Sequence, residues 1–538
     1  MGAGGIHSVE LIVLVLLILV VAFAALAKRL ETPYPIILVI GGLILSVIPH
    51  TPHVELDPEL VFLIILPPLL FSAAFATPWR DFRYNLVSIS MLAVGLVGFT
   101  VFGVAAASRW ILPGFDWRMG LVLGAVVSTT DAIAATSIAS RLGMPKRITQ
   151  ILEGESLLND ATGLLALEFA TAMLVTGSTP SIFEGVWRLL YLVFGSIAIG
   201  LVAGKLIHIL AVKIVDAPIE ITISLIAPYV AYLAAESARA SGVLATVTCG
   251  LYLGHKSSLI LSRGARLSGH AVWEMIDFVL NGFVFLLLGF QLPYILSGIH
   301  MRHLGKLVLL GLLFSAVVIL LRFIWVYPGA ALSYAIRRRI LHQPETLPSP
   351  KALFVIGWTG MRGVVALAAA ISLPKLLDSG AAFPGRNMMI FLTFCVIFVT
   401  LVLQGLTLPP LIRRLGLAGA AQQDTEEREA RHAMVEAALA YLEHGRDDAE
   451  PEFASVYDEL IRLYRRRLNA LDSNESAESG YRPEDYRRWT ELLRHVAAIQ
   501  HATVLHLRNQ NKINDDVMRR LERELDLAEA RYADSEGA

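Results

Sequence analysis

Residues 153–160 read Glu-Gly-Glu-Ser-Leu-Leu-Asn-Asp and place three carboxylates, one hydroxyl and one amide within eight positions. The run lies inside an apolar segment that extends from about residue 147 to residue 176. An ionisable side chain in a bilayer is costly unless it has a partner or faces a watery cavity. The alternative is that these acids cap a helix of a soluble protein, but then the sequence after them would not continue to be apolar. The run therefore indicates a membrane-spanning helix that lines a polar cavity.

The composition also indicates a membrane protein. Hydrophobic residues make up 55% of the 538 residues and charged residues only 17%, whereas about a quarter of a soluble domain is charged. The first 420 residues contain 20 acids and 28 bases, and the remainder contains 26 acids and 17 bases. We therefore predict a transmembrane domain over residues 1–420 and a cytoplasmic helical region over residues 421–538. The two cysteines exclude a disulfide framework and a Cys-based metal site.

A helix needs about 20 apolar residues to cross a bilayer, and on this basis we identify thirteen candidate membrane helices in the first part. The predicted fold is an all-α polytopic membrane protein with about 13 transmembrane helices, followed by a helical cytoplasmic tail. The predicted spans are 9–27, 33–49, 58–77, 85–109, 118–139, 147–176, 182–212, 217–237, 241–255, 268–297, 305–335, 351–376 and 386–415.

Basic residues predict the orientation of these spans. The first run has no basic residue before it and two after it, Lys28 and Arg29. This pattern argues against a cleaved signal peptide and places the N-terminus outside. Counting onward, the predicted inner loops carry most of the Lys and Arg, and an odd number of spans leaves the C-terminal tail in the cytoplasm.

Two spans contain sequence that favours a break in the helix. Residues 128–134 read Ser-Thr-Thr-Asp-Ala-Ile-Ala, and residues 357–363 read Gly-Trp-Thr-Gly-Met-Arg-Gly. Short polar side chains compete for backbone hydrogen bonds, and a broken helix exposes carbonyls that can hold a cation. For the first run, an intact helix whose hydroxyls bond to the preceding turn is the alternative. The positions of the two runs suggest two inverted six-helix repeats with crossed broken helices.

The first of these runs and the acidic run supply a set of candidate ion ligands. Ser156 and Asp160 are i,i+4 neighbours on one helix face, and Glu155 and Asn159 are neighbours on the adjoining face. Hard oxygen atoms suit a small cation that has lost its water. Asp160 can hold a proton or a cation but not both, so each displaces the other and the two fluxes are coupled. One exchangeable carboxylate predicts one cation for one proton, and Arg362 is a fixed positive charge that cannot carry the proton.

Two more acids, Glu274 and Asp277, occur in the tenth predicted span. We expect them near its inner end, where an acid costs little free energy and caps the helix or contacts headgroups. Direct ion binding is the alternative. In the tail, residues 427–442, 452–471 and 482–530 are predicted to be amphipathic helices of a regulatory or dimer-contacting module.

The sequence resembles the monovalent cation:proton antiporters of the sodium/proton exchanger type, in their bacterial branch. The resemblance covers almost all of the first part, and two motifs carry most of it: Gly-Glu-Ser-Leu-Leu-Asn-Asp at 154–160 and Gly-Met-Arg-Gly at 360–363. Further matches are residues 66–71, 130–132, 241–245 and 404–409. The chain departs from many relatives at Thr129, where they have Pro, and at Ser72, where they have Glu or Asp.

The resemblance implies a role for each matching residue. Asp160 would bind the cation and the proton, Thr130 and Ser156 would help to coordinate the ion, and Asp131 and Asn159 would shape the unwound crossing. Glu155 would pair with the fixed arginine, Arg362. The resemblance further implies a homodimer with an elevator-like alternation of access, and Asn159 matches the branch regarded as electroneutral.

The sequence thus predicts a bacterial inner-membrane antiporter for Na+, with Li+ as a further candidate cation, that serves pH homeostasis. A K+/H+ antiporter, a cation channel and a transport-dead sensor are the alternatives. An ATP-driven pump is disfavoured because no Gly-x4-Gly-Lys-[Ser/Thr] run occurs. We expect no enzymatic activity, no cofactor besides the transported ions, and no nucleic-acid partner.

Overall fold

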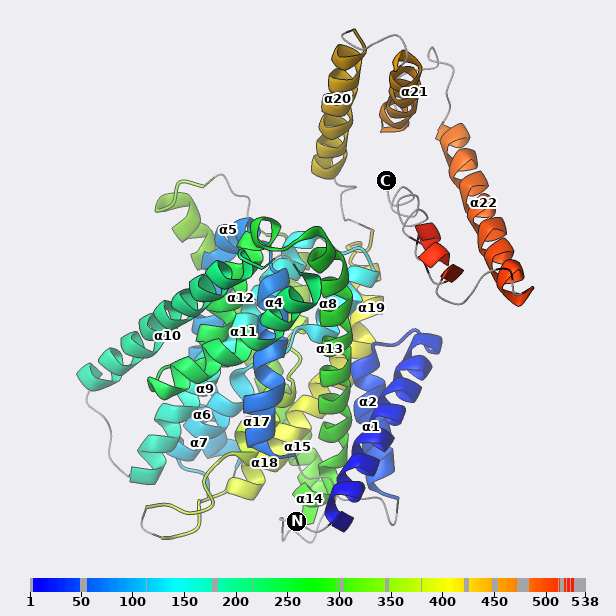
Figure 1. Ribbon diagram of the computed structural model, residues 1–538. Coiled ribbons are helices and arrows are strands. Elements are labelled where there is room, and N and C mark those ends of the chain that lie inside the picture. Colours follow the sequence, from blue (N-terminus) through cyan, green and yellow to red (C-terminus); the bar gives the residue numbers. More distant parts are fainter. Residues whose placement is uncertain are drawn as a thin grey trace. The chain divides into compact units, whose positions relative to one another are not determined.

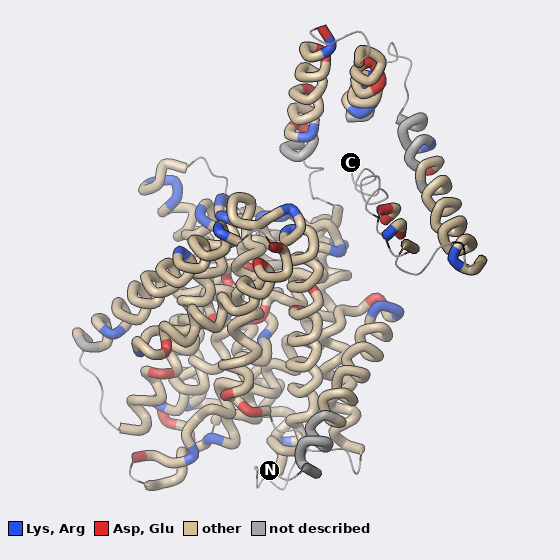
Figure 2. Tube along the Cα trace, in the orientation of Figure 1, with Lys and Arg blue, Asp and Glu red and all other residues tan. Residues whose placement is uncertain are grey.

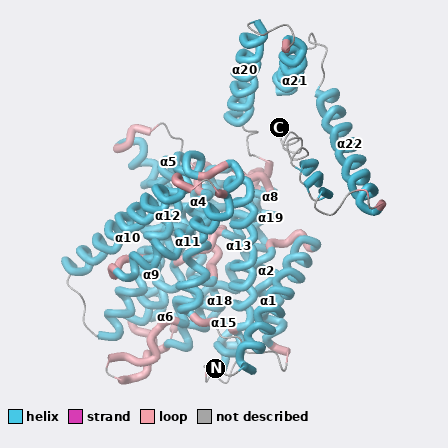
Figure 3. Tube along the Cα trace, viewed as in Figure 1, coloured by secondary structure: helices cyan, strands magenta, loops and turns pink. Residues whose placement is uncertain are grey.

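The computed structural model shows a helical chain that divides into two compact units, residues 1–421 and 422–538 (Figures 1 and 3). The structure describes residues 3–48, 56–112, 114–176, 182–214, 216–297, 299, 304–343, 348–378, 380–419, 425–447, 453–471, 483–510, 512, 517–518, 520–522 and 524–526. Over these residues the chain forms helices and turns, and its only extended pairing is an isolated bridge between Leu376 and Ala382. The predicted all-α fold class is confirmed.

We call residues 1–421 the membrane unit. Its first half comprises α1 (Ala3–Arg29), α2 (Tyr34–Ser46), α3 (Pro58–Leu60), η1 (Val61–Ile65), α4 (Leu66–Ala76), α5 (Trp79–Ser90), η2 (Met91–Leu96), α6 (Val97–Ile111), α7 (Trp117–Ser128), α8 (Ile133–Arg141) and α9 (Lys146–Thr176). Its second half comprises α10 (Ile182–Ala211), α11 (Ala217–Ser237), α12 (Gly242–Ile260), α13 (Arg263–Phe290), α14 (Leu292–Ser297), α15 (Leu304–Arg339), α16 (Pro350–Trp358), α17 (Val364–Ile371), α18 (Arg386–Val399), η3 (Thr400–Gln404) and α19 (Gly405–Arg414). The elements η1, η2 and η3 are π-helical turns within longer helices.

All thirteen predicted spans coincide with helical segments. Ten helical stretches among the described residues are long and apolar enough to cross a membrane. The other three predicted spans correspond to the short α2, to α12 and to the interrupted pair α16 and α17. The number of crossings and the inverted repeats stay predictions.

The outside of the membrane unit is apolar, as expected for a surface in contact with lipid. Leu206 of α10 is 63% exposed and Leu309 of α15 is 67% exposed. The interior is packed by pairs of neighbouring helices, among them α6 with α7, α7 with α9, α4 with α12 and α2 with α13. Lipid cannot form hydrogen bonds with backbone N–H and C=O groups. Helices satisfy these groups internally and are therefore the expected structure within a membrane.

Both predicted helix breaks are present. Residues 129–132 separate α7 from α8, and residues 359–363 separate α16 from α17. Thr129 has an extended backbone, with φ −68° and ψ 139°, which ends the helical hydrogen bonding of α7. The alternative of an intact helix over residues 128–134 is therefore wrong.

The second unit contains α20 (Thr425–Asp447), α21 (Ala454–Leu471) and α22 (Pro483–Asn509). Ion pairs between Arg446 and Asp458 (2.5 Å) and between Arg465 and Glu443 (2.6 Å) join α20 to α21. The predicted helix starts at 452 and 482 lie outside the described residues. The last helix was expected to reach residue 530, but α22 ends at Asn509, and much of the stretch beyond it lies outside the described residues.

Candidate functional site

The two helix breaks are bonded to each other. The backbone N–H of Asp131 donates to the carbonyl of Met361, with an N···O distance of 2.8 Å. A broken helix leaves backbone donors and acceptors without intrahelical partners, and within a membrane they must find partners in the protein. This bond satisfies one donor and one acceptor and fixes the crossing of the two interrupted helices.

Asp131 and Arg362 stabilise three of the four helix ends at the crossing. Asp131 Oδ1 accepts from the N–H of Ile133, the first residue of α8, at 2.8 Å. Arg362 Nε donates to the carbonyl of Val127 in the last turn of α7 at 3.1 Å, and its Nη1 donates to the carbonyl of Gly360, just beyond α16. Helix N-termini carry partial positive charge and C-termini partial negative charge. Each ionised side chain therefore faces the helix ends of opposite sign.

A π-helical turn supports the crossing from a third side. Thr400 Oγ1, in η3, accepts from the backbone N–H of Arg362 at 3.1 Å. Thr400 is fully buried, so this bond holds the unwound segment where water cannot compete. Single π-helical turns of this kind are frequent at functional sites.

Gly363 leaves room for the Asp131 side chain. A Cβ added at Gly363 would lie 2.7 Å from Asp131 Cβ and 2.9 Å from its Cγ. We expect Gly363→Ala to displace Asp131, to destabilise the unit by about 1–3 kcal/mol through overpacking and to lower the exchange rate. Gly98→Ala in α6 is the control, because a Cβ there meets nothing within 4 Å. Thermal unfolding and transport assays would measure both effects, and two variants with equal behaviour would refute this account of the crossing.

The fixed partner of Glu155 is Arg322 of α15. Both guanidinium Nη atoms donate to the Glu155 carboxylate, Nη2 at 2.8 Å from Oε2, and each residue is only 1% exposed. The predicted pairing of Glu155 with Arg362 is wrong, since Arg362 bonds the backbone carbonyls instead. The sequence analysis missed Arg322, although a charge in the middle of the apolar run 305–335 was the signal that could have revealed it.

Helix α9 holds the first helix break through three polar side chains. Thr130 Oγ1 donates to Glu155 Oε1 at 3.0 Å, and Asn159 Nδ2 donates to Thr130 Oγ1 at 2.5 Å and to the Thr130 carbonyl at 3.2 Å. Ser156 Oγ accepts from the N–H of Ala132 at 3.3 Å. The acidic run therefore fixes the unwound backbone of residues 129–132.

Asp160 lies at a cavity of about 360 Å³ in the membrane unit. It is 7% exposed, and among the described residues it makes no hydrogen bond or ion pair. The cavity brings together four residues predicted for the site, Thr130, Asp131, Ser156 and Asp160, whereas Glu155, Asn159 and Arg362 lie outside its lining. The structure thus separates residues that reach the cavity from residues that hold the backbone around it.

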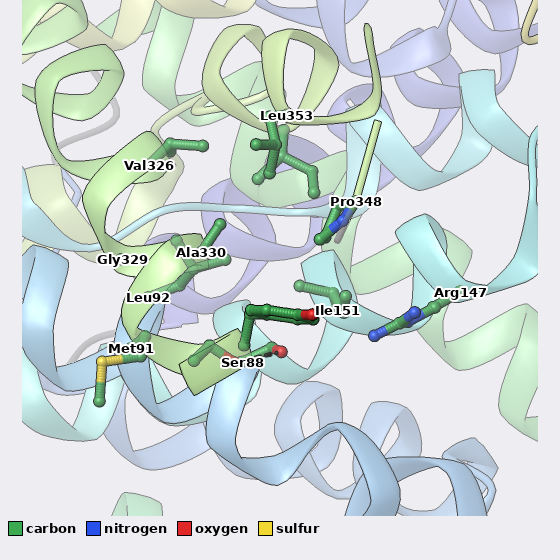
Figure 4. Close-up of a pocket in the computed structure, with 13 residues that line it drawn as sticks. Ser88, Met91, Leu92, Arg147, Ile151, Val326, Gly329, Ala330, Pro348 and Leu353 are labelled. Carbon is green, nitrogen blue, oxygen red and sulfur yellow. Dashed lines mark hydrogen bonds between the residues drawn. The ribbon is translucent and has the colours of Figure 1, made fainter. Parts of the chain in front are cut away.

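A second cavity, shown in Figure 4, has a different character. It is about 40 Å³ in volume and is lined by Ser88, Arg147, Ser333 and Tyr334 among mostly apolar side chains. No carboxylate of the described residues lines it. A cavity with an arginine and without an acid does not suit a cation.

Asp277 lies deeper than the sequence analysis predicted. It stands in the middle of α13 and accepts a hydrogen bond from Ser72 Oγ of α4 at 2.5 Å. The expectation that it caps a helix is therefore wrong, and the expected contact with headgroups stays a prediction. Glu274, one turn earlier, is exposed.

A buried carboxylate without a partner, next to a crossing of two broken helices, defines the site of a membrane transporter for a small cation. The sequence profile described as "Sodium/hydrogen exchanger, transmembrane" matches residues 14–414. The chain belongs to this family, and it is a transporter rather than an enzyme.

Individual relatives agree with this assignment. The chain is 34% identical to an uncharacterized Na+/H+ exchanger of Mycobacterium tuberculosis, over 99% of this chain and 98% of the relative. It is 31% identical to a sodium, potassium, lithium and rubidium/H+ antiporter of Bacillus pumilus, over 89% of this chain and 72% of the relative. The fold resembles that of the sodium proton antiporter MjNhaP1 from Methanocaldococcus jannaschii, with a TM-score of 0.61 and 18% identity, over 76% of this chain and 99% of that one.

Proposed function

We propose that the chain exchanges Na+ for H+ across the bacterial inner membrane, one ion for one proton, by competition of the two for Asp160. Cation/proton exchange as such follows from the family. The observation that carries the mechanism is the Asp160 carboxylate, which is buried, borders a cavity and has no partner among the described residues. A bound proton and a bound cation each remove the same negative charge, so occupancy by one excludes the other.

The proposed cation ligands are Asp160, the Ser156 hydroxyl and the oxygens of Thr130, which the cavity brings together. Hard oxygen ligands of this kind suit Na+ and Li+. Glu155 was also a predicted ligand, but Arg322 and Thr130 already bond its carboxylate. Because these bonds already occupy the carboxylate oxygens, we propose that Glu155 positions Thr130 rather than binds the cation.

The electroneutral stoichiometry is supported by Asn159. This residue stands next to Asp160 and uses its amide to hold Thr130. A second acid at that position would add a second exchangeable charge, whereas the amide adds none. K+/H+ exchange is the second candidate, because potassium stands in the name of the Bacillus pumilus relative.

Competition makes a quantitative prediction for the wild-type chain in proteoliposomes. Lowering the pH by one unit in the range where the proton competes should raise the half-saturating Na+ concentration about tenfold and leave the maximal rate unchanged, because one proton displaces one cation. The assay follows proton movement after addition of Na+, Li+ or K+, with and without a clamped membrane voltage. Cation flux that moves no protons and collapses the voltage would identify a channel instead.

We further propose an outside N-terminus and a cytoplasmic tail, as the basic residues indicate, and a homodimer with elevator-like movement, as the resemblance implies. Figure 2 supports the orientation, because Lys and Arg gather at the end of the membrane unit near the labels of α5, α8 and α12 in Figure 1. An excess of basic residues is typical of the cytoplasmic side of a membrane protein.

A further inference from the structure

Among the described acids of the membrane unit, seven are buried or half-buried: Asp81, Asp131, Glu153, Glu155, Asp160, Glu220 and Asp277. Five of them accept bonds that satisfy at least one carboxylate oxygen. The donors are Gln150 to Asp81, Ile133 to Asp131, Arg322 to Glu155, Ser262 to Glu220 and Ser72 to Asp277. Glu153 and Asp160 have no such partner within the described part of the chain. A shielded carboxylate without a protein partner is free to bind an ion or water.

These two acids lie on the same face of α9. Glu153 precedes Ser156 by three residues and Asp160 by seven, which is close to two helical turns, or about 10 Å along the axis. All three residues line the same cavity. The cavity therefore contains a second unpaired carboxylate, displaced along α9 toward its first residue, Lys146.

The surroundings of Glu153 differ from those of Asp160. Glu153 is half-buried rather than buried, and Thr77 and Thr136 are other polar residues in the cavity lining. The cavity volume of about 360 Å³ is large enough for several water molecules. A cation beside Glu153 can therefore keep much of its hydration, whereas a cation on Asp160 also meets the hydroxyl and carbonyl oxygens of the helix break.

We propose that Glu153 is a second cation site, at which a partly hydrated alkali cation is held before it moves to Asp160. The proposal rests on the proposed exchange at Asp160. The Glu153 carboxylate raises the cation concentration within the cavity by electrostatic attraction. Because the ion at this site keeps its water, the site attracts Li+, Na+ and K+ equally. Selection among the three cations then takes place at Asp160.

The test is Glu153→Gln in the full-length chain, reconstituted in proteoliposomes. We expect the half-saturating cation concentration to rise about three- to tenfold, the effect of one charge at roughly 10 Å in a partly aqueous site. The factor should be the same for every transported cation, the maximal rate should stay within about twofold, and added choline chloride should reduce the difference from wild type by screening. Glu153→Asp, which keeps the charge, should restore most of the affinity.

Glu168→Gln is the matched control. It removes the same charge from the same helix, but Glu168 is exposed, pairs with Arg188 at 3.2 Å and lies outside the cavity lining, so its half-saturating concentration should equal that of wild type. An unchanged concentration in Glu153→Gln, or a loss confined to the maximal rate, would overturn the proposal. A change that differs among Li+, Na+ and K+ would refute a hydrated ion at this site. Absence of exchange in the wild-type chain would instead refute the proposed function, and the wild-type measurement comes first.

Discussion

Replacement of Asp160 with Asn should abolish exchange while leaving the fold intact. The amide is nearly the same size as the carboxylate, but it can neither bind a proton in the working pH range nor neutralise a cation. The substitution removes a few kcal/mol of ion-binding free energy. Because about 1.4 kcal/mol corresponds to a factor of ten, the exchange rate should fall at least about a hundredfold. No hydrogen bond or ion pair of the described residues involves the Asp160 carboxylate, so the substitution breaks no internal contact of this kind.

The measurement is proton movement driven by Na+ in proteoliposomes, together with the thermal unfolding midpoint of the purified protein. Glu168→Gln serves again as the control for loss of one negative charge from α9. Asp160→Glu retains the charge on a longer side chain and should keep measurable exchange with a changed cation preference. Exchange at the wild-type rate in Asp160→Asn would show that the exchangeable site lies elsewhere.

Replacement of Arg322 with Gln should cause the largest loss of stability. Arg322 and Glu155 are each 1% exposed and bonded through both Nη atoms, so the variant leaves a buried carboxylate without its counter-charge. Breaking a buried pair in this way costs about 3–5 kcal/mol. Release of Glu155 would also remove one of the bonds that position Thr130, and we expect exchange to be lost together with stability.

A double variant separates the two partners. Glu155→Gln combined with Arg322→Gln leaves no unpaired charge and should be more stable than Arg322→Gln alone. The control is Arg188→Gln, whose partner Glu168 forms an exposed pair, and it should change stability by less than about 1 kcal/mol. Thermal unfolding followed by tryptophan fluorescence would rank the three variants. Equal midpoints for Arg322→Gln and Arg188→Gln would refute a structural role for the buried pair.

The helical framework could be predicted from the sequence because a helix that crosses the membrane needs a run of about 20 apolar residues. Both interruptions could also be predicted, since the hydroxyl-rich run at 128–134 and the glycine-rich run at 357–363 depart from an ordinary span within a few residues. The prediction that Thr130, Asp131, Ser156 and Asp160 belong to one site agrees with their shared cavity, although their roles in transport stay predictions.

The partners of the charged residues could not be predicted from sequence spacing. Glu155 and Arg322 are 167 positions apart, and only the tertiary arrangement of the helices decides whether Arg322 or Arg362 reaches the acid. Asp277 was misplaced for a related reason. The predicted span began at residue 268, whereas α13 begins at Arg263, so an acid in the middle of α13 was treated as one near an end.

The charges around the crossing bear on how an exchanger avoids leaking ions. Asp131 and Arg362 bring opposite charges to one crossing, and Glu155 and Arg322 cancel each other within the same region. Of the buried acids at the crossing and its cavity, Asp160 is the one without a partner among the described residues, and we propose that a proton or a monovalent cation neutralises it. Under the proposed mechanism, movement of the site through the low-dielectric interior costs little free energy with either ion bound and much more when Asp160 is empty and ionised. If the proposed movement takes place, the same electrostatic balance that stabilises the broken helices opposes the return of an empty, ionised site.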